Sequence, residues 1–129
     1  PAIAKGECVI CDRFTDSTIA YQGYGRGLNI KNLEMINNIA TEGLTPDITF
    51  ILDIDPEKAS ERMKAEAPDR MESAGIDFFQ KIRQGYHQIM EQNQSRCILI
   101  NGEQSQENVF KEINQLIMKR FKGELVCSN

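Results

Sequence analysis

The stretch DRFTDSTIAYQGYGRG, residues 12–27, decides how this chain is interpreted. It follows a short apolar run at residues 8–11, whose composition predicts a β-strand. In a parallel α/β sheet, ligands bind at the carboxyl ends of the strands. We therefore expect the pair Asp12 and Arg13 to face a binding pocket.

The polar side chains of this stretch suit a phosphate that carries a base and a sugar. The Arg13 guanidinium is a planar fork that grips phosphate oxygens, and the Asp12 carboxylate can hold Mg²⁺ or its waters. Further hydrogen-bonding groups follow at Ser17, Thr18, Tyr21 and Gln22. An isolated Asp-Arg pair would indicate only a turn with a surface ion pair, but the ordered set favours a nucleotide site.

The composition is that of one globular domain. The chain has 129 residues, 40% of them hydrophobic and 26% charged, with a formal net charge of −4. This charge argues against a general binder of nucleic acids or membrane surfaces. No apolar run approaches the ~20 residues that a membrane-spanning helix needs, and no signal peptide is recognised. We expect a cytoplasmic enzyme or binding domain.

The four cysteines could suggest a metal or redox site. Cys8 and Cys11 form a C-x-x-C motif, but zinc needs a second pair of ligands. Only Cys97, Cys127 and His87 remain, and they are scattered singly. We expect reduced thiols that mostly fill apolar space, and neither a metal nor a redox site at these cysteines.

The hydrophobic pattern predicts a doubly wound α/β fold in the order β-α-β-α-α-β-α. Strands are expected at residues 8–11, 48–54 and 97–100, because these runs are apolar and largely continuous. Helical periodicity follows each strand, with Asp55-Pro56-Glu57 and Ser105 as helix starts and Gly43 and Gly123 as stops. A long amphipathic helix carries Phe79, Ile82, Tyr86 and Ile89, and the last helix buries Val109, Ile113, Leu116 and Ile117. Residues 1–6 resemble the last turn and glycine stop of a helix.

The helix around residues 33–40 has more apolar surface than one sheet contact needs. Leu33, Ile36 and Ala40 share one face, and Met35 and Ile39 share another. Two interpretations stay open, a core helix and a subunit interface.

Two further clusters are candidates for the same site. Arg62, Lys64 and Arg70 follow the second strand and could close over a migrating phosphoryl group, although a solvated helix face would have the same pattern. Asn101, Gly102 and Glu103 form a loop after the last strand, where any α/β protein has a polar turn.

Two other patterns are set aside. Gly23-x-Gly25-x-Gly27 lacks the G-x-G-x-x-G spacing of a dinucleotide site, and we expect a flexible exit from the helix that carries Tyr21. His87 has no partnered nucleophile nearby, so no hydrolase site is indicated.

The chain closely resembles bacterial thymidylate kinase. The resemblance rests first on residues 12–27, above all Asp12-Arg13, Ser17 and Ala20-Tyr21-Gln22-Gly23. It continues in order over nearly the whole chain, through Thr45-Pro46-Asp47, Asp55-Pro56-Glu57, Glu61-Arg62, Asp69-Arg70, Asp77-Phe78-Phe79, Tyr86 and Ile100-Asn101-Gly102. It implies the parallel sheet with flanking helices of the P-loop nucleoside monophosphate kinases.

The resemblance also implies an activity: transfer of the ATP γ-phosphate to dTMP with Mg²⁺, giving dTDP, in a homodimer. The residue matching Arg13 binds the acceptor phosphate, and the one matching Asp12 lies by the metal. Ser17, Thr18, Tyr21 and Gln22 then line the thymidine pocket. Arg62, with Asn101, Gly102 and Glu103, lies on the ATP side. Lys64 and Arg70 belong to a lid at about residues 62–75, where lysine replaces the arginine typical of the family.

The chain differs from the family by having no Walker A motif, G-x-x-x-x-G-K-[ST]. We therefore expect residues 1–129 to be the carboxyl-terminal portion of one kinase domain, incomplete at its amino terminus and inactive alone. The family's first strand would lie between residues 8–11 and 48–54 in the sheet. The alternatives are another nucleoside monophosphate or deoxynucleoside kinase, or a fragment that binds nucleotide or dimerises without turnover.

Overall fold

The computed structural model describes residues 1–64 and 75–121, without the side chains of Met63 and Lys64. Most of the predicted lid, including Arg70, lies outside these residues, as do Gly123 and Cys127.

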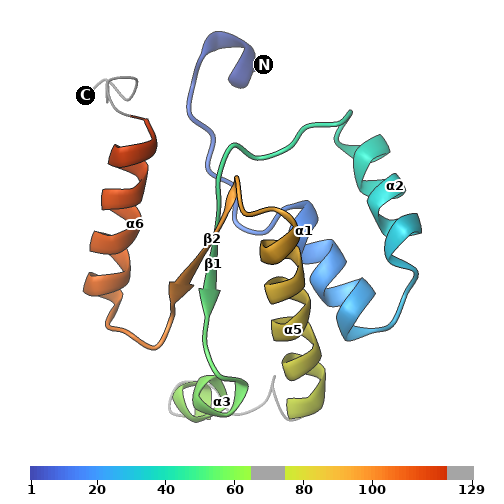
Figure 1. Cartoon of the computed structure of the whole chain (residues 1–129), viewed down its shortest axis with the longest axis vertical. Coiled ribbons are helices and arrows are strands. Elements are labelled where there is room, and N and C mark those ends of the chain that lie inside the picture. The colour runs from blue at the N-terminus through green and yellow to red at the C-terminus, as the bar shows by residue number, and fades with distance from the viewer. Residues whose placement is uncertain (65–74, 122–129) are drawn as a thin grey trace.

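A parallel pair of strands forms the centre of the described structure (Figure 1). Strand β1, Thr49–Asp53, pairs with β2, Cys97–Asn101, in a register that places Asp53 opposite Asn101. Ile51 and Ile100 are buried. Two of the three predicted strands, those at residues 48–54 and 97–100, are confirmed, and their carboxyl ends lie at one edge of the sheet.

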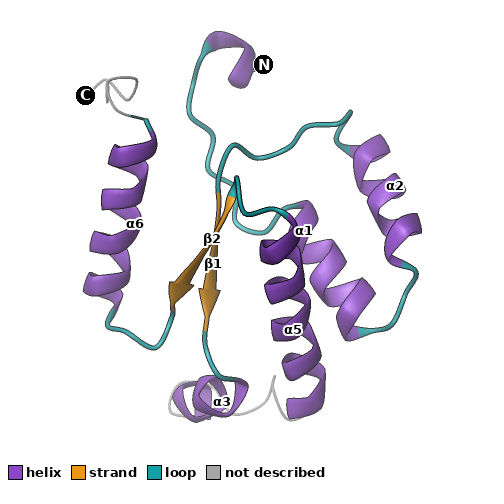
Figure 2. Cartoon of the chain, viewed as in Figure 1, coloured by secondary structure: helices purple, strands orange, loops and turns teal. Residues whose placement is uncertain are grey.

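Helices cover both sides of the strand pair (Figure 2). Helix α6, Gln106–Arg120, lies on one side. The other side holds α1 (Thr15–Thr18), the π-helical segment η2 (Ile19–Gly25), α2 (Ile30–Ala40) and α5 (Ile76–Gln92). Helix α3, Pro56–Lys64, lies beyond the carboxyl ends of the strands. This arrangement confirms the α/β class.

The predicted helix starts and the stop at Gly43 are confirmed, whereas the stop predicted at Gly123 lies outside the described residues. The Asp55 carboxylate accepts a hydrogen bond from the Glu57 amide at 3.0 Å at the start of α3, and Ser105 accepts from the Asn108 amide at 3.3 Å. Gly43 follows α2 with φ 77°, and Gly6 ends a short 3₁₀ turn with φ 76°. The predicted apolar stripe of α6 is only half-buried.

The core lies between α5 and the α1–η2 helix. Ile19 and Ala20 pack with Ile82 and Ile89 of α5. An added Cβ on Gly25 would lie 2.8 Å from Phe78 Cε2. The prediction of a flexible glycine exit is therefore wrong for Gly23 and Gly25, which are helical and closely packed. Gly27 lies outside the helix with φ 75°.

The prediction of a strand at residues 8–11 is also wrong. No ladder bond is found there within the described part of the chain, and Ile10 is 93% exposed. An apolar run becomes a strand only when a neighbour accepts and donates its backbone hydrogen bonds. Cys8 and Cys11 are exposed as well, so the prediction of apolar filler holds for buried Cys97 and not for these two.

Helix α2 leaves most of its apolar residues in solvent. Leu33 is buried against the core, whereas Met35, Ile36 and Ile39 are 63%, 59% and 70% exposed. The core interpretation therefore applies to Leu33 alone. In the described ranges, no helix has the length and apolar character to cross a membrane.

Candidate functional site

Asp12 and Arg13 lie in an exposed bend just before α1. Arg13 has φ 63°, in the left-handed region that few residues other than glycine adopt. Such strain is found where the surrounding structure needs a particular side-chain direction. At Arg13, that direction turns the guanidinium back toward η2.

The Arg13 guanidinium lies on the ring of Tyr21. Its Nη2 donates to the Tyr21 hydroxyl at 3.1 Å, and its Cζ is 4.9 Å from the ring centroid. The two predicted site residues are thus held together, and Arg13 keeps donors available for an anion.

Helix α5 also packs against the helical segment formed by α1 and η2. The hydroxyls of Ser17 and Tyr86 lie 2.9 Å apart, and the Tyr21 and Phe78 rings meet edge-on with centroids 6.3 Å apart. Burial raises the pKa of Tyr86 above its ordinary value, so its hydroxyl is neutral at pH 7 and can donate or accept in the contact with Ser17. Thr18 and Gln22 lie on the same segment and are half-buried.

Of the second predicted cluster, Arg62 contacts the third cluster at the carboxyl ends of the strands. Arg62 of α3 donates from Nη1 to the Gly102 carbonyl at 3.0 Å and from Nη2 to the Glu103 carbonyl at 2.7 Å. The Gly102 amide donates to the Asp53 carbonyl at 2.7 Å, and a Cβ at this position would lie 3.0 Å from that oxygen. The Asn101 carboxamide oxygen accepts from the Glu103 amide at 2.9 Å. Glycine at 102 therefore permits the close approach of the two strand ends.

The Glu103 carboxylate is also held in place. It pairs with Lys58 at 2.7 Å, and this contact lowers the pKa of Glu103 and raises that of Lys58. Of the predicted lid cations, Lys64 ends α3 without a described side chain, and Arg70 lies outside the described residues. Within those residues, no hydrogen bond joins the Asp12–Gln22 segment to the Arg62 and Gly102 cluster.

Sequence reasoning missed a charged cluster at the end of β1. The Asp53 carboxylate accepts from Arg83 Nε at 2.7 Å and Nη2 at 2.9 Å, and it lies 3.0 Å from His87 Nε2. Arg83 Nη1 donates to Asp55 at 3.0 Å. The Arg83 contact, with His87, lowers the pKa of Asp53 to about 2. The available signal was a carboxylate ending an apolar strand, with an arginine and a histidine four residues apart on one helix.

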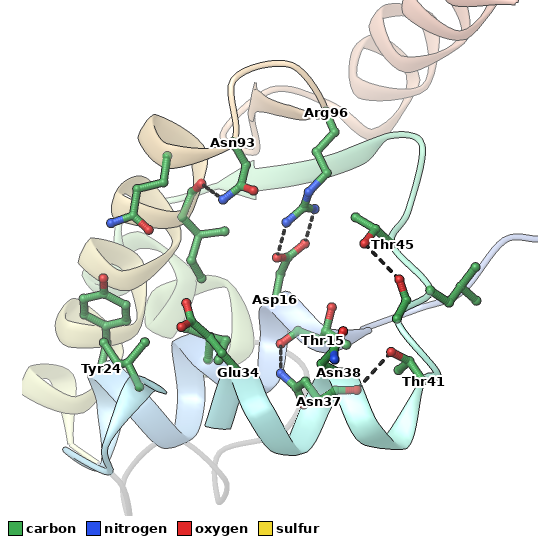
Figure 3. Close-up of a pocket in the computed structure, with 16 residues that line it drawn as sticks. Thr15, Asp16, Tyr24, Glu34, Asn37, Asn38, Thr41, Thr45, Asn93 and Arg96 are labelled. Carbon is green, nitrogen blue, oxygen red and sulfur yellow. Dashed lines mark hydrogen bonds and ion pairs between the residues drawn. The ribbon is translucent and has the colours of Figure 1, made fainter. Parts of the chain in front are cut away.

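A separate cavity of about 200 Å³ lies near the amino-terminal ends of the strands (Figure 3). The buried pair Asp16 and Arg96 faces it, together with Asn37 and Asn93. None of the predicted site residues lines this cavity. We therefore do not assign it to the nucleotide site.

Among the described residues, the side chains that could bind the expected Mg²⁺ are few. Over residues 1–64 and 75–121, no group of three or more His, Cys, Asp or Glu side chains could hold a metal ion. Mg²⁺ in phosphoryl-transfer sites commonly uses one or two carboxylates together with substrate phosphates. The single exposed carboxylate of Asp12 fits that mode of binding.

Parallel strands flanked by helices define an α/β protein, and the polar loops lie at the carboxyl ends of the strands, where this class of protein binds its ligands. The thymidylate kinase family model matches residues 1–113. The chain belongs to the thymidylate kinase family, and its fold is that of the P-loop nucleoside monophosphate kinases.

Curated relatives agree with this assignment. The chain is 40% identical to the thymidylate kinase of Maridesulfovibrio salexigens over 99% of its length, covering 63% of that protein. It is 42% identical to the thymidylate kinase of Caldanaerobacter subterraneus over 98% of its length, covering 61%. For the thymidylate kinase of Chlorobaculum parvum, the identity is 46% over 88% of the chain and 57% of the relative. The chain thus spans about three fifths of the relatives it matches.

Proposed function

We propose that this chain is part of an enzyme that transfers the γ-phosphate of ATP to dTMP and forms dTDP. Membership of the thymidylate kinase family supports this, because relatives of that name match the chain along nearly its whole length. The observation that carries the proposal is the placement of Arg13 on the Tyr21 ring, beside Ser17 and Tyr86. A cation, an aromatic ring and two hydroxyls together suit a nucleotide that carries one phosphate.

In this proposal, Arg13 binds the dTMP phosphate and stabilises the charge that develops during transfer. Ser17, Thr18, Tyr21 and Gln22 bind the nucleoside. Asp12 holds Mg²⁺ together with nucleotide phosphates, and the metal neutralises phosphate charge when bound. Arg62, Asn101, Gly102 and Glu103 form the ATP side, and Lys64 and Arg70 close over the migrating phosphoryl group.

We also propose that the enzyme is a homodimer that pairs through α2. The exposed Met35, Ile36 and Ile39 form an apolar face on this helix. Exposed apolar patches of this kind are typical of protein interfaces. Equilibrium sedimentation of the wild-type protein is expected to show a dimer. Ile39→Glu places a charge in the proposed interface, and we expect this variant to sediment as a monomer.

The proposed activity is tested by dTMP-dependent ADP formation from Mg-ATP. Two proteins are compared: this chain and an extended form in which a P-loop-containing amino-terminal segment precedes Pro1. We expect turnover by the extended form alone, with dTMP preferred over dUMP, dGMP and thymidine. Activity of the short chain would contradict the expected need for a P-loop, and preference for another acceptor would indicate a different nucleoside or nucleotide kinase. Nucleotide binding without ADP formation in both proteins would support the non-catalytic alternative.

A matched pair of variants tests the role of Arg13 in the extended form. Arg13→Ala removes the guanidinium, and we expect a loss of kcat/KM for dTMP on the order of a hundredfold, comparable to the loss of an electrostatic donor in other enzymes. Arg26→Ala removes an exposed arginine of the same stretch and serves as the control. Equal effects of the two substitutions would contradict a specific role for Arg13.

A further inference from the structure

Two side chains of α5 contact the carboxyl end of β1: His87 lies 3.0 Å from the Asp53 carboxylate, and Arg83 makes most of the contacts. Arg83 engages all three guanidinium nitrogens with carboxylates, two with Asp53 and one with Asp55, at 2.7–3.0 Å. The bidentate geometry with Asp53 is the strongest form of such a contact. The Arg13 guanidinium, by contrast, contacts Tyr21 and pairs with no carboxylate within the described residues. Arg83 therefore serves to fix protein groups rather than to receive a phosphate.

The residues of the two carboxylates that Arg83 holds, Asp53 and Asp55, also contact the segments that carry the proposed ATP side. The backbone carbonyl of Asp53 accepts from the Gly102 amide at 2.7 Å. The side chain of Asp55 accepts from the Glu57 amide at 3.0 Å and so begins α3. Helix α3 in turn carries Arg62, which donates to the Gly102 and Glu103 carbonyls. These hydrogen bonds, together with the backbone of α3 and of Asp53, connect α5, the end of β1, α3 and the loop after β2.

The proposed dTMP side uses other residues of α5. Tyr86 contacts Ser17, and Phe78 contacts Tyr21, whereas the Arg83 guanidinium donates its hydrogen bonds to Asp53 and Asp55. A change at Arg83 should therefore displace the groups around Arg62 and leave the Ser17 and Tyr21 groups in place.

We propose that Arg83 is a positioning residue for the ATP side of the site. It holds the Asp53 and Asp55 carboxylates so that Arg62, Gly102 and Glu103 keep the spacing that the nucleotide requires. This inference rests on the proposed function, because that function assigns these three residues to ATP. Arg83 itself does not touch the substrate.

The test measures the two substrates separately in the extended form. Arg83→Gln removes the charge and two of the three carboxylate contacts, and we expect the KM for ATP to rise on the order of tenfold because the positioned groups shift. The KM for dTMP should stay within about twofold, since its residues are not in contact with Arg83. Lys81→Gln removes one charge from an exposed position of the same helix and should change neither value.

Two milder variants protect the test against a loss of folding. Arg83→Lys keeps the charge but lacks the planar fork that pairs two nitrogens with Asp53, so its KM for ATP should fall between those of the wild type and Arg83→Gln. Asp55→Asn keeps an oxygen to cap α3 and loses the ion pair with Arg83, and it should also raise the KM for ATP. Thermal unfolding of each variant establishes that the compared proteins are folded.

A second readout does not depend on dTMP. Binding of a fluorescent ATP analogue to the extended form should weaken on the order of tenfold in Arg83→Gln and not in Lys81→Gln. If the wild type binds this analogue but does not phosphorylate dTMP, the proposed function falls while the binding result still decides the role of Arg83. Equal ATP affinity in the wild type and Arg83→Gln would overturn the inference, as would a parallel rise of both KM values. A wild type that does not bind the analogue would overturn the inference together with the ATP-side assignment.

Discussion

At the scale of single residues, the environment of a carboxylate determines its role. Asp12 and Asp53 both follow apolar runs in the sequence, and only Asp12 was expected to matter. In the structure Asp12 is exposed, whereas Asp53 accepts hydrogen bonds from Arg83 and lies beside His87. The exposed Asp12 carboxylate therefore suits a ligand for Mg²⁺, whereas the Asp53 carboxylate, which already accepts hydrogen bonds from Arg83, suits a structural contact.

The depressed pKa of Asp53 makes a prediction about acid stability. Its pKa falls from 3.8 to about 2 on folding, so the ionised form stabilises the folded state by about 2 kcal/mol. Because the folded pKa is the lower one, this contribution is complete above about pH 4 and is lost as the pH falls toward 2. Urea unfolding of the protein at several pH values should show this loss.

Two variants isolate the contribution of Asp53. Asp53→Asn should be less stable at pH 7 and should lose less stability between about pH 4 and 2 than the wild type does. Asp47→Asn changes an exposed carboxyl and should keep the wild-type slope. If Asp53→Asn loses as much unfolding free energy as the wild type between about pH 4 and 2, other groups are responsible for the acid sensitivity.

At the scale of elements, the contact between α5 and η2 depends on small residues. An added Cβ on Gly85 of α5 would lie 2.7 Å from atoms of Tyr24 in η2. Helical periodicity predicts α5 from its large apolar residues, and it says nothing about which glycine lies at a helix crossing. The identity of the facing element decides that, and it is set by the tertiary fold.

Gly85→Ala is expected to destabilise the protein although alanine is the better helix former. Alanine in a helix interior gains up to about 1 kcal/mol over glycine. Here the new methyl group would overlap Tyr24, and such overpacking typically costs about 1–3 kcal/mol. Gln84→Ala changes an exposed neighbour in the same helix and is the control. Thermal unfolding that finds Gly85→Ala at least as stable as the wild type would contradict the packing argument.

At the scale of the whole molecule, a second ion pair, besides that of Arg83 with Asp53, joins the helical layer to the sheet. Asp16 of α1 pairs with Arg96, just before β2, at 2.7 and 2.8 Å, and the two side chains are 11% and 16% exposed (Figure 3). Thr49 of β1 donates to the same carboxylate at 3.3 Å. Thr49 and Arg96 are 33 and 80 positions away from Asp16 in the sequence, so these contacts join distant parts of the chain.

Removal of one partner from this pair is expected to be costly. Arg96→Met leaves a mostly buried carboxylate without its partner and should lower the free energy of unfolding by about 3 kcal/mol. The double variant Arg96→Met with Asp16→Leu should recover much of that loss, since it removes both charges.

The surface pair Glu107 and Lys111 provides the control for this cycle. Both side chains are largely exposed, so Lys111→Met should have a small effect on urea unfolding. If Arg96→Met is no more destabilising than Lys111→Met, the ion pair does not hold the two layers together.

The sequence by itself determined the local elements and the family. Strands 49–53 and 97–101, the helix starts at Asp55 and Ser105 and the stop at Gly43 follow from backbone preferences and hydrophobic period, which are local properties. The Asp12-Arg13 and Ala20-Tyr21-Gln22 motifs likewise indicated the family from contiguous residues.

Only the tertiary structure decided which residues meet. Residues 8–11 have the composition of a strand but form none, because a strand also needs a neighbour to complete its hydrogen bonds. The Arg83 contacts with Asp53 and Asp55 join residues about thirty positions apart, a pairing that depends on how α5 lies against β1. The positions of charged residues and the periodicity of apolar residues are local properties of the sequence. The partner of each group depends instead on how the chain folds back on itself.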